Sequence, residues 1–568
     1  MAFKATLLAN ILAAIATHAW MKTYDPVPLG VVVTALLTVP LISTFIANFI
    51  NPSSSMFSLV LAYPSFYFAL TASICAYRLS PFHPLAKFPG PIMLKLTKLP
   101  STWIAFKGKN HVYVKDLHDR YGPIIRTGPN ELSTIDKELI PQILGNQGMP
   151  RGPQWEARSF GSGESNGLDS LISSRYTAVH AELRVQWNKA FSAEALRNYE
   201  ELLIPRLVEF NNHLKKACGK GTAQLNIANW ISRFTYDFMG DWVFSENFKT
   251  MENGDKEGRI EMMDKSMHLM SIIQQIPWIA PSVRSFPILN KWIVKFVSYN
   301  IQDSTIRSQK EMKRKDLFYY MGEAAGRSGS DFDVIAENCN LASIAASDTT
   351  ASILSNAVYS LLSNPEKYKK LQQEVDKTFT EHEINSFHLS TGEEVDGKMY
   401  GEILGSMKYL NAVLNETMRL YPVIPTGLHR APEPGSSSKT LRIGNDIILL
   451  PEGNSVNVSL YALHRDSRNF SPHPDAFIPE RWLSSSEKSE YVTSKDMFIP
   501  FSMGPANCAG RTLALVELRY TLSFLVRNFN MEFDTPNYDP ARWVQDLRDQ
   551  YVLQKGGLHL RMSLRGEQ

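Results

Sequence analysis

An unusually long stretch without charge limits what the first part of this 568-residue chain can form. From Pro26 to Tyr77 there are 52 residues and no Asp, Glu, Lys or Arg. The segment 51–55, Asn-Pro-Ser-Ser-Ser, divides the stretch into two apolar halves of about 20 residues, the length of a membrane-spanning helix. A single buried core is the alternative, but it would rarely lack charge for so long. We therefore expect spans at 27–50 and 56–76.

The residues around this stretch predict how the chain is divided. The earlier segment 5–20 is apolar but short and contains His18, so it is either a third span or a signal-like start. Arg78, Lys87 and further lysines follow the last span, which favours a cytoplasmic position for the rest of the chain. We expect a membrane anchor at 1–80, a stiff proline-rich linker at 81–91, and a large domain within 81–568.

Charge and cysteine content exclude two classes. The net charge of +3 is close to balance, so nucleic acid is not an expected partner. The four cysteines have no paired spacing, which argues against a disulfide scaffold and favours a reducing compartment; they are Cys75, Cys218, Cys339 and Cys508.

One of these cysteines lies in a loop suited to bind a metal. Cys508 follows a Gly-Pro turn and precedes an apolar helical pattern that begins near Thr512. A thiolate there would lie close to unpaired backbone N–H groups at the helix N-terminus, which lower the pKa of a thiol. Gly504 allows the turn, and Gly510 would let a flat ligand approach the backbone. A buried free cysteine is the alternative.

This loop, Phe501-x-x-Gly504-x-x-x-Cys508-x-Gly510, resembles the haem-binding loop of the cytochrome P-450 family. The resemblance implies haem b (iron protoporphyrin IX) with Cys508 as the axial ligand of the iron. It is incomplete at one position. Ala506 stands where the family usually has an Arg or His that contacts a haem propionate.

Other basic residues are expected to bind the propionates. His180 and Arg184 lie four residues apart, on one face of a predicted helix. Such a pair is usually a solvated face, but it resembles the family's helix across the haem, which implies that both residues bind propionates. His429 or Arg430, in a segment expected to line the pocket, is predicted to replace the missing cation.

A helix without Pro or Gly is predicted from Asp333 to Ser363. It contains Asp348, Thr349 and Thr350 among apolar residues, and an acid there is costly to bury without a purpose. The segment resembles the family's oxygen-activating helix. The resemblance implies that Asp348 relays protons and Thr349 steadies bound dioxygen. The family usually has Gly at the position of Ala346.

Three further segments complete the analysis. Glu416 and Arg419, with Arg481, resemble the family's structural ion-pair triad. Residues 120–133 predict a hairpin that resembles the family's first sheet. The apolar segment 271–297 is interpreted as ordinary core, and the family parallel, a loop that dips into the bilayer, is the alternative.

The resemblance covers roughly residue 81 to the end and is closest to eukaryotic, membrane-anchored, fungal members. It implies a mainly α-helical fold with small β-sheets. The implied function is monooxygenation of a lipophilic small molecule, in secondary metabolism, at the endoplasmic reticulum membrane with the catalytic domain facing the cytoplasm. Electrons would come from NADPH through NADPH–cytochrome P-450 reductase, which Lys189 and Arg511 could dock. A haem-thiolate isomerase or dehydratase without reductase, and a non-enzymatic haem sensor, are the alternatives.

Overall fold

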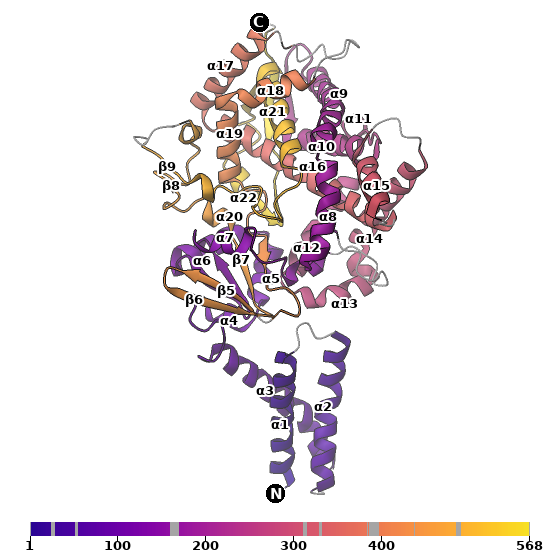
Figure 1. Cartoon of the computed structure of the whole chain (residues 1–568), viewed down its shortest axis with the longest axis vertical. Coiled ribbons are helices and arrows are strands. Elements are labelled where there is room, and N and C mark those ends of the chain that lie inside the picture. Colours follow the sequence, from indigo (N-terminus) through magenta and orange to yellow (C-terminus); the bar gives the residue numbers. More distant parts are fainter. Residues whose placement is uncertain are drawn as a thin grey trace.

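The structure is a computed structural model that describes residues 2–23, 29–50, 55–158, 170–310, 315–328, 332–382, 384, 397–436, 438–483 and 490–566. A large, mainly helical domain carries a separate bundle of three helices that projects from one end (Figure 1). The expected fold class, mainly α with small sheets, is confirmed.

The projecting bundle contains α1 (Ala2–Thr23), α2 (Leu29–Ile50) and α3 (Ser55–Leu79), and α1 packs against both others. Several polar groups lie between its helices: Asn10 and Thr44 are fully buried, and Asn10 Nδ2 donates to Thr44 Oγ1 over 3.2 Å. Its outer surface is apolar, with Phe45 and Phe68 more than 70% exposed. Within the described residues two segments are long and apolar enough to cross a membrane, Leu29–Phe49 and Val60–Leu79. Such a bundle fits a membrane anchor.

The proline-rich segment after α3, predicted as a stiff linker, is packed on the large domain. Leu85 is fully buried and Phe88 is 6% exposed. Arg126 donates from its backbone N to Pro89 O over 2.7 Å and from Nη1 to Arg78 O over 3.0 Å. Apolar side chains between the prolines gain burial this way, so the anchor is attached through a fixed segment.

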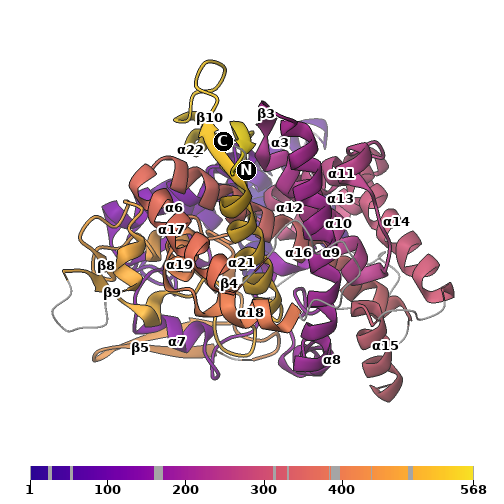
Figure 2. The ribbon, with the colours of Figure 1, turned by 90° about the horizontal axis from the view of Figure 1, so that it is seen from above.

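Two helices run through the middle of the large domain, α16 (Phe332–Leu362) and α21 (Arg511–Asn528) (Figure 2). The predicted helix 333–363 is thus confirmed to within one residue at each end. The helices that flank this pair on its two sides are α8 (Thr177–Ala190), α9 (Ala193–Cys218), α10 (Ile227–Phe244), α17 (Pro365–Glu381), α18 (Gly397–Ser406) and α19 (Lys408–Leu420).

Shorter helices cover the periphery. They are α4 (Ile92–Leu96), α5 (Leu99–Phe106), α6 (Asn110–Tyr121), α7 (Leu139–Leu144), α11 (Thr250–Asn253), α12 (Arg259–Ile273), α13 (Ala280–Ser285), α14 (Pro287–Gln309), α15 (Leu317–Ser328), α20 (Leu460–Leu463) and α22 (Arg542–Asp546). The 3-10 helices are η1 (Pro153–Arg158), η2 (Pro277–Ile279), η3 (Pro479–Trp482) and η4 (Lys495–Met497).

The largest sheet has the strand order β1-β2-β7-β4, from β1 (Ile124–Gly128), β2 (Glu131–Thr134), β7 (Ser455–Val458) and β4 (Leu428–Arg430). β1 and β2 pair antiparallel, which confirms the predicted hairpin. A second sheet has the order β10-β13-β3, from β10 (Phe529–Phe533), β13 (His559–Leu564) and β3 (Thr222–Asn226). Three two-stranded sheets pair β5 (Ser438–Ile443) with β6 (Asp446–Pro451), β8 (Phe470–Ser471) with β9 (Val492–Thr493), and β11 (Arg548–Gln550) with β12 (Val552–Gln554).

The segment 271–297 is core only in part, and that interpretation is wrong for two of its four aromatic side chains. Phe296 is buried, but Trp278 is 58% and Phe286 is 60% exposed. In Figure 1, α13 lies at the end of the domain that faces the anchor. Exposed Trp103 and Phe106 lie on α5, which packs against α12. The geometry favours the alternative, a surface that contacts lipid.

Candidate haem site

The loop around Cys508 is held in a fixed shape by its own backbone. Cys508 N donates to Phe501 O over 2.9 Å, which closes the loop just before α21 begins at Arg511. Gly504 has φ +68°, and a Cβ there would lie 2.2 Å from Leu144 O, so only glycine fits. A Cβ on Gly510, in contrast, would meet only the Phe191 ring at 3.6 Å, so the protein itself does not demand glycine there.

The Cys508 thiol faces opposing electrostatic effects. The residue is exposed, yet protein surrounds the sulfur on most sides, and this desolvation raises the pKa of the thiol. The Gly510 N–H and the guanidinium groups of Arg184 and Arg511 lower the same pKa. All three favour the thiolate, the form in which cysteine binds a metal.

Arg184 braces the cysteine loop. It lies on α8, and its Nη1 and Nη2 donate to O and Oδ1 of Asn507 over 2.6 Å each. Its Nε donates to Asn188 Oδ1 over 2.9 Å. The residue that was expected to bind a propionate is therefore engaged with the residue between Ala506 and Cys508.

Three other basic side chains form a cluster, and nitrogen atoms of each have no hydrogen-bond partner in the part of the chain that the structure describes. Arg430 Nη1 and Nη2, Arg151 Nε and His180 Nε2 are buried and have no hydrogen-bond partner among the described residues. Arg151 joins Arg430 through a β-bridge, and its guanidinium stacks 4.2 Å above the Trp155 ring. Burial, then Arg151, holds the pKa of Arg430 well below its usual value. Burial, together with Arg151, Arg430 and Arg184, lowers the pKa of His180 to about 4.

Such a cluster is unstable unless an anion completes it, because unpaired buried cations are costly. The two carboxylates of haem b have the charge and the acceptor atoms that Arg430, Arg151 and His180 lack. These residues therefore fit the propionate side of a haem whose iron Cys508 would ligate.

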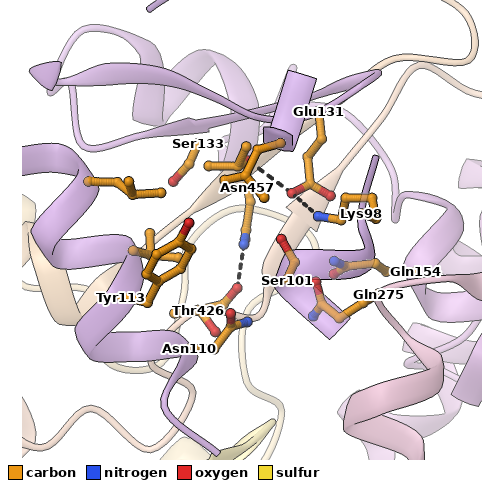
Figure 3. A pocket seen from close by; sticks show the side chains of 14 residues that line it. Lys98, Ser101, Asn110, Tyr113, Glu131, Ser133, Gln154, Gln275, Thr426 and Asn457 are labelled. Carbon is orange, nitrogen blue, oxygen red and sulfur yellow. Dashed lines mark hydrogen bonds and ion pairs between the residues drawn. The ribbon is translucent and has the colours of Figure 1, made fainter. Parts of the chain in front are cut away.

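His429 belongs to a different environment from Arg430. Neighbouring residues on a strand point to opposite faces, and β4 follows this rule. His429 Nε2 lies 3.5 Å from Glu131 Oε2, and Lys98 Nζ lies 2.7 Å from Glu131 Oε1. Figure 3 shows Lys98 pointing at Glu131 beside a polar cavity of about 20 Å³. Lys98 and His429 hold the pKa of this buried carboxyl below its usual range, although burial itself raises it. Both expected alternatives have buried atoms without a hydrogen-bond partner among the described residues, but His429 has one, Nδ1, while Arg430 has two donors, Nη1 and Nη2, on a side chain that is not paired with Glu131.

The middle of α16 has one accessible face. From Asn338 to Leu361 every residue is buried except Ala345, Ala346, Thr349 and Tyr359. The first three follow helical spacing and share one face. Thr349 Oγ1 donates to Ala345 O over 2.7 Å. This face is the part of the helix where a bound molecule can reach the backbone and the hydroxyl.

Asp348 points elsewhere. It is 4% exposed, accepts a short hydrogen bond from Gln554 Nε2, and lies 4.0 Å from Lys555 Nζ. Burial raises the pKa of Asp348, while Lys555 and Gln554 lower it. The acid and Thr349 are thus adjacent in sequence but face different surroundings.

A second buried acid contacts the same helix. Glu517, on α21, is 2% exposed, and its Oε1 lies 3.0 Å from Thr350 Oγ1. Thr350 also lies 2.9 Å from Ala346 O, to which its single hydroxyl hydrogen can donate. Burial raises the pKa of Glu517 to about 8, although a hydrogen bond from the Thr350 hydroxyl to Glu517 Oε1 lowers it.

Glu416, Arg419 and Arg481 come together in the core. Arg419 Nη2 and Nε lie 2.8 Å from the two Glu416 oxygens, and Arg481 Nε lies 3.1 Å from Oε1. Trp482 Nε1 and the Ile478 backbone N–H also donate to Glu416, each over 2.9 Å. Arg419 further donates to three backbone carbonyls, those of His464, Pro474 and Ala476. This network fixes the segment that leads to the cysteine loop.

Several site residues were missed by the sequence analysis. Arg151 and Asn507 carry no periodic or motif signal. Glu517 stands in an apolar helical pattern, Thr512–Leu518, where a lone acid is the kind of signal that singled out Asp348. Gln554 and Lys555 lie about 200 residues from Asp348, beyond any local pattern.

Comparisons with known proteins agree with this geometry. The family model described as cytochrome P-450 matches residues 84–547. The cytochrome P-450 monooxygenase FCK2 of Fusarium pseudograminearum is 32% identical over 506 residues, covering 86% of this chain and 84% of the relative. The cytochrome P-450 monooxygenase orf5 of Eupenicillium brefeldianum is 29% identical, covering 88% and 95%. The cytochrome P-450 monooxygenase aba2 of Botryotinia fuckeliana is 30% identical, covering 80% and 84%.

Proposed function

The chain belongs to the cytochrome P-450 family and is a monooxygenase of the fungal type, and from this premise we propose that it inserts one oxygen atom of O2 into a lipophilic small molecule of secondary metabolism. The observation that carries the proposal is the accessible face of α16. It presents the Thr349 hydroxyl together with Ala345 and Ala346, and the buried Asp348 precedes Thr349 in the sequence.

The cofactor that we propose is haem b. Cys508 would ligate the iron, and Arg430, Arg151 and His180 would hold the propionates through their unpartnered nitrogen atoms. When bound, the haem supplies dioxygen binding and O–O cleavage, which the sulfur ligand favours. Phe501 and Gly504 shape the loop that carries the cysteine, and Gly510 would leave room for the haem to approach the backbone.

The protein's own residues position an oxygen atom at the accessible face of α16 and supply protons to it. Thr349 Oγ1 can exchange its bond to Ala345 O for a bond to an oxygen atom at the accessible face. Asp348 lies on the other side of the same turn, where burial raises its pKa and so favours its taking up and passing on a proton. The Glu416–Arg419–Arg481 network keeps the cysteine loop in place without contacting the reacting atoms.

Electrons would arrive from NADPH through NADPH–cytochrome P-450 reductase. Of the two cations expected to dock it, Lys189 is already paired with Glu323 at 2.6 Å. Arg511 is exposed next to the cysteine loop, 5.7 Å above the Phe501 ring, and is the better candidate.

We further propose that residues 1–80 anchor the enzyme in the endoplasmic reticulum membrane and that 81–568 form the catalytic domain on the cytoplasmic side. Lys22 Nζ lies 3.8 Å above the Tyr77 ring, so Lys22 and Arg78 share one end of the bundle, as the positive-inside rule favours for the cytoplasmic end. Three spans explain the inward polar groups of α1, since a surface helix would not bury them. The exposed Trp278 and Phe286 would meet the bilayer, from which a lipophilic substrate can enter.

Expression with a reductase in a metabolite-producing fungal host, under ¹⁸O2, tests the reaction. We expect products heavier by one labelled oxygen atom, and unlabelled rearranged products would favour an isomerase. Thr349→Ala tests the site. It should leave the carbon-monoxide spectrum intact while NADPH is consumed with peroxide release in place of product. Thr349→Ser keeps the hydroxyl and is the matched control. A normal ratio of product to NADPH in Thr349→Ala would refute the role of Thr349.

A further inference from the structure

A cavity on the far side of α16 shares only the Asp348 network with the site described so far. Its volume is about 390 Å³, and residues of α10, α12, α16 and the chain after β12 line it. It is large enough for several waters and polar enough to hold them, since charged side chains enter from every wall. Asp348 forms part of its inner wall.

A second carboxyl group shares this wall with Asp348. Asp264 lies on α12, is half-buried and lines the same cavity. The two carboxyl groups interact: burial and then the charge of Asp348 raise the pKa of Asp264 to about 7. Lys555 Nζ, 4.0 Å from Asp348 Oδ1, opposes both shifts, and Gln554 fixes the other oxygen of Asp348.

The remaining charged and titratable groups around Asp264 are known from the cavity lining. Glu261 on α12 and Asp255 before it add negative charge and raise the pKa of Asp264 further. Arg233 and Tyr236 line the cavity from α10, and Lys555 from the chain after β12. Two acids close to one ammonium group favour a state in which the pair keeps one proton at neutral pH.

We propose that Asp264 is the proton-collecting residue of this enzyme, taking protons from water in the cavity and passing them to Asp348. The step is a proton transfer alone: a hydronium ion from the bulk solvent, carried through the water of the cavity, gives its proton to the Asp264 carboxylate and leaves water. The Asp264 carboxyl then protonates the Asp348 carboxylate and returns to a carboxylate itself, and Asp348 serves the Thr349 side of α16. Lys555 and Gln554 position Asp348 for this transfer. The role of Asp264 in turnover rests on the proposed monooxygenase function. The sharing of a proton between Asp264 and Asp348 does not depend on that function.

Infrared titration of the haem-loaded full chain in nanodiscs tests the pair without any turnover. Wild-type enzyme should show a protonated-carboxyl band that fades as the pH rises through about 7. Asp264→Asn should remove this band. Glu261→Gln is the matched control, because Glu261 is an exposed acid one turn earlier on the same wall. Its carboxylate forms an ion pair with Lys265, whereas Asp264 interacts with Asp348. The Glu261→Gln enzyme should keep the band, with its midpoint at a slightly lower pH because the charge of Glu261 raises the pKa of Asp264.

Turnover with NADPH and reductase tests the role. Asp264→Asn should keep the carbon-monoxide spectrum and release a several-fold larger share of the NADPH electrons as peroxide, whereas Asp264→Glu should restore the wild-type share. In wild type this share should rise above pH 7, where Asp264 loses its proton, and the dependence should vanish in Asp264→Asn. Lys555→Met removes the cation that lowers both pKa values, so it should move the dependence to higher pH.

The outcomes separate the two claims. A wild-type enzyme that never oxidises NADPH defeats the proposed function, while the infrared titration still reports on the pair. The proposal is refuted if Asp264→Asn shows the same protonated-carboxyl band as wild type and releases the same share of the NADPH electrons as peroxide. If Asp264→Asn yields no haem protein, the Lys555→Met shift decides, since a merely structural network would lower the yield without moving the pH dependence.

Discussion

Replacing Arg430 by Met should loosen the haem more than replacing Arg184. The sequence predicted Arg184 as a propionate ligand, but both of its terminal nitrogens donate to Asn507. Arg430 has Nη1 and Nη2 buried without a partner within the described part of the chain, so it is the better donor to a propionate. Met is close to Arg in length and fills the same space without charge, so packing around β4 is largely kept.

The magnitude follows from the free atoms of Arg430. A hydrogen bond to a charged group contributes roughly 1.5–3 kcal/mol, which corresponds to about a 10- to 150-fold change in an equilibrium constant. Arg430 can donate at least one such bond to a propionate, so haem should leave Arg430→Met faster by about this factor. The protein without haem should instead become more stable, because an unpaired buried cation is removed.

Transfer of haem to an excess of apomyoglobin, followed in the Soret band, measures the loss rate. Arg442→Met, at an exposed position on β5, is the matched control and should behave as wild type. The rate of haem loss from Arg184→Met should lie between those of wild type and Arg430→Met, since this variant loses the hydrogen bonds to Asn507. Equal rates for wild type and Arg430→Met, with rapid loss from Arg184→Met, would refute the assignment of the cluster.

Three further predictions concern the ligand, the core and the anchor. Cys508→Ser should abolish the red-shifted band of the reduced carbon-monoxide complex, while Ser in place of Cys75, Cys218 or Cys339 keeps it; a normal band in Cys508→Ser would exclude this ligand. Glu416→Gln leaves two buried guanidinium groups without a carboxylate and should cost about 3–5 kcal/mol, seen as a lower urea midpoint or loss of haem protein; an unchanged midpoint would contradict the network. With three spans, a tag on the N-terminus should be protected from protease in intact microsomes while the catalytic domain is cleaved, and an accessible tag would indicate two spans.

The parts of the site that the sequence predicted are those that depend on neighbours in the chain. The helix around Asp348 and Thr349 could be found because it lacks Pro and Gly over its whole length. The i, i+3 spacing of Glu416 and Arg419 brings their side chains together in any helix. The direction in which a strand residue points could not be predicted, because it depends on partners from other parts of the chain. Period-2 alternation separates His429 from Arg430, but only the sheet decides which of them meets Glu131.

Ala506 shows how a missing cation is replaced by residues from elsewhere in the fold. A basic side chain two residues before the cysteine would do two things at once: it would supply positive charge and tie the loop down. Here Arg184 takes over the second task through Asn507, the next residue along the chain. We propose that the charge comes from Arg430 and from Arg151, which is brought beside Arg430 by a β-bridge between segments about 280 residues apart in sequence. Because each task can be met from a different element, the substitution at 506 need not weaken the site. Restoring an arginine at 506 should therefore gain little haem affinity, since Asn507 and Arg184 already hold the loop.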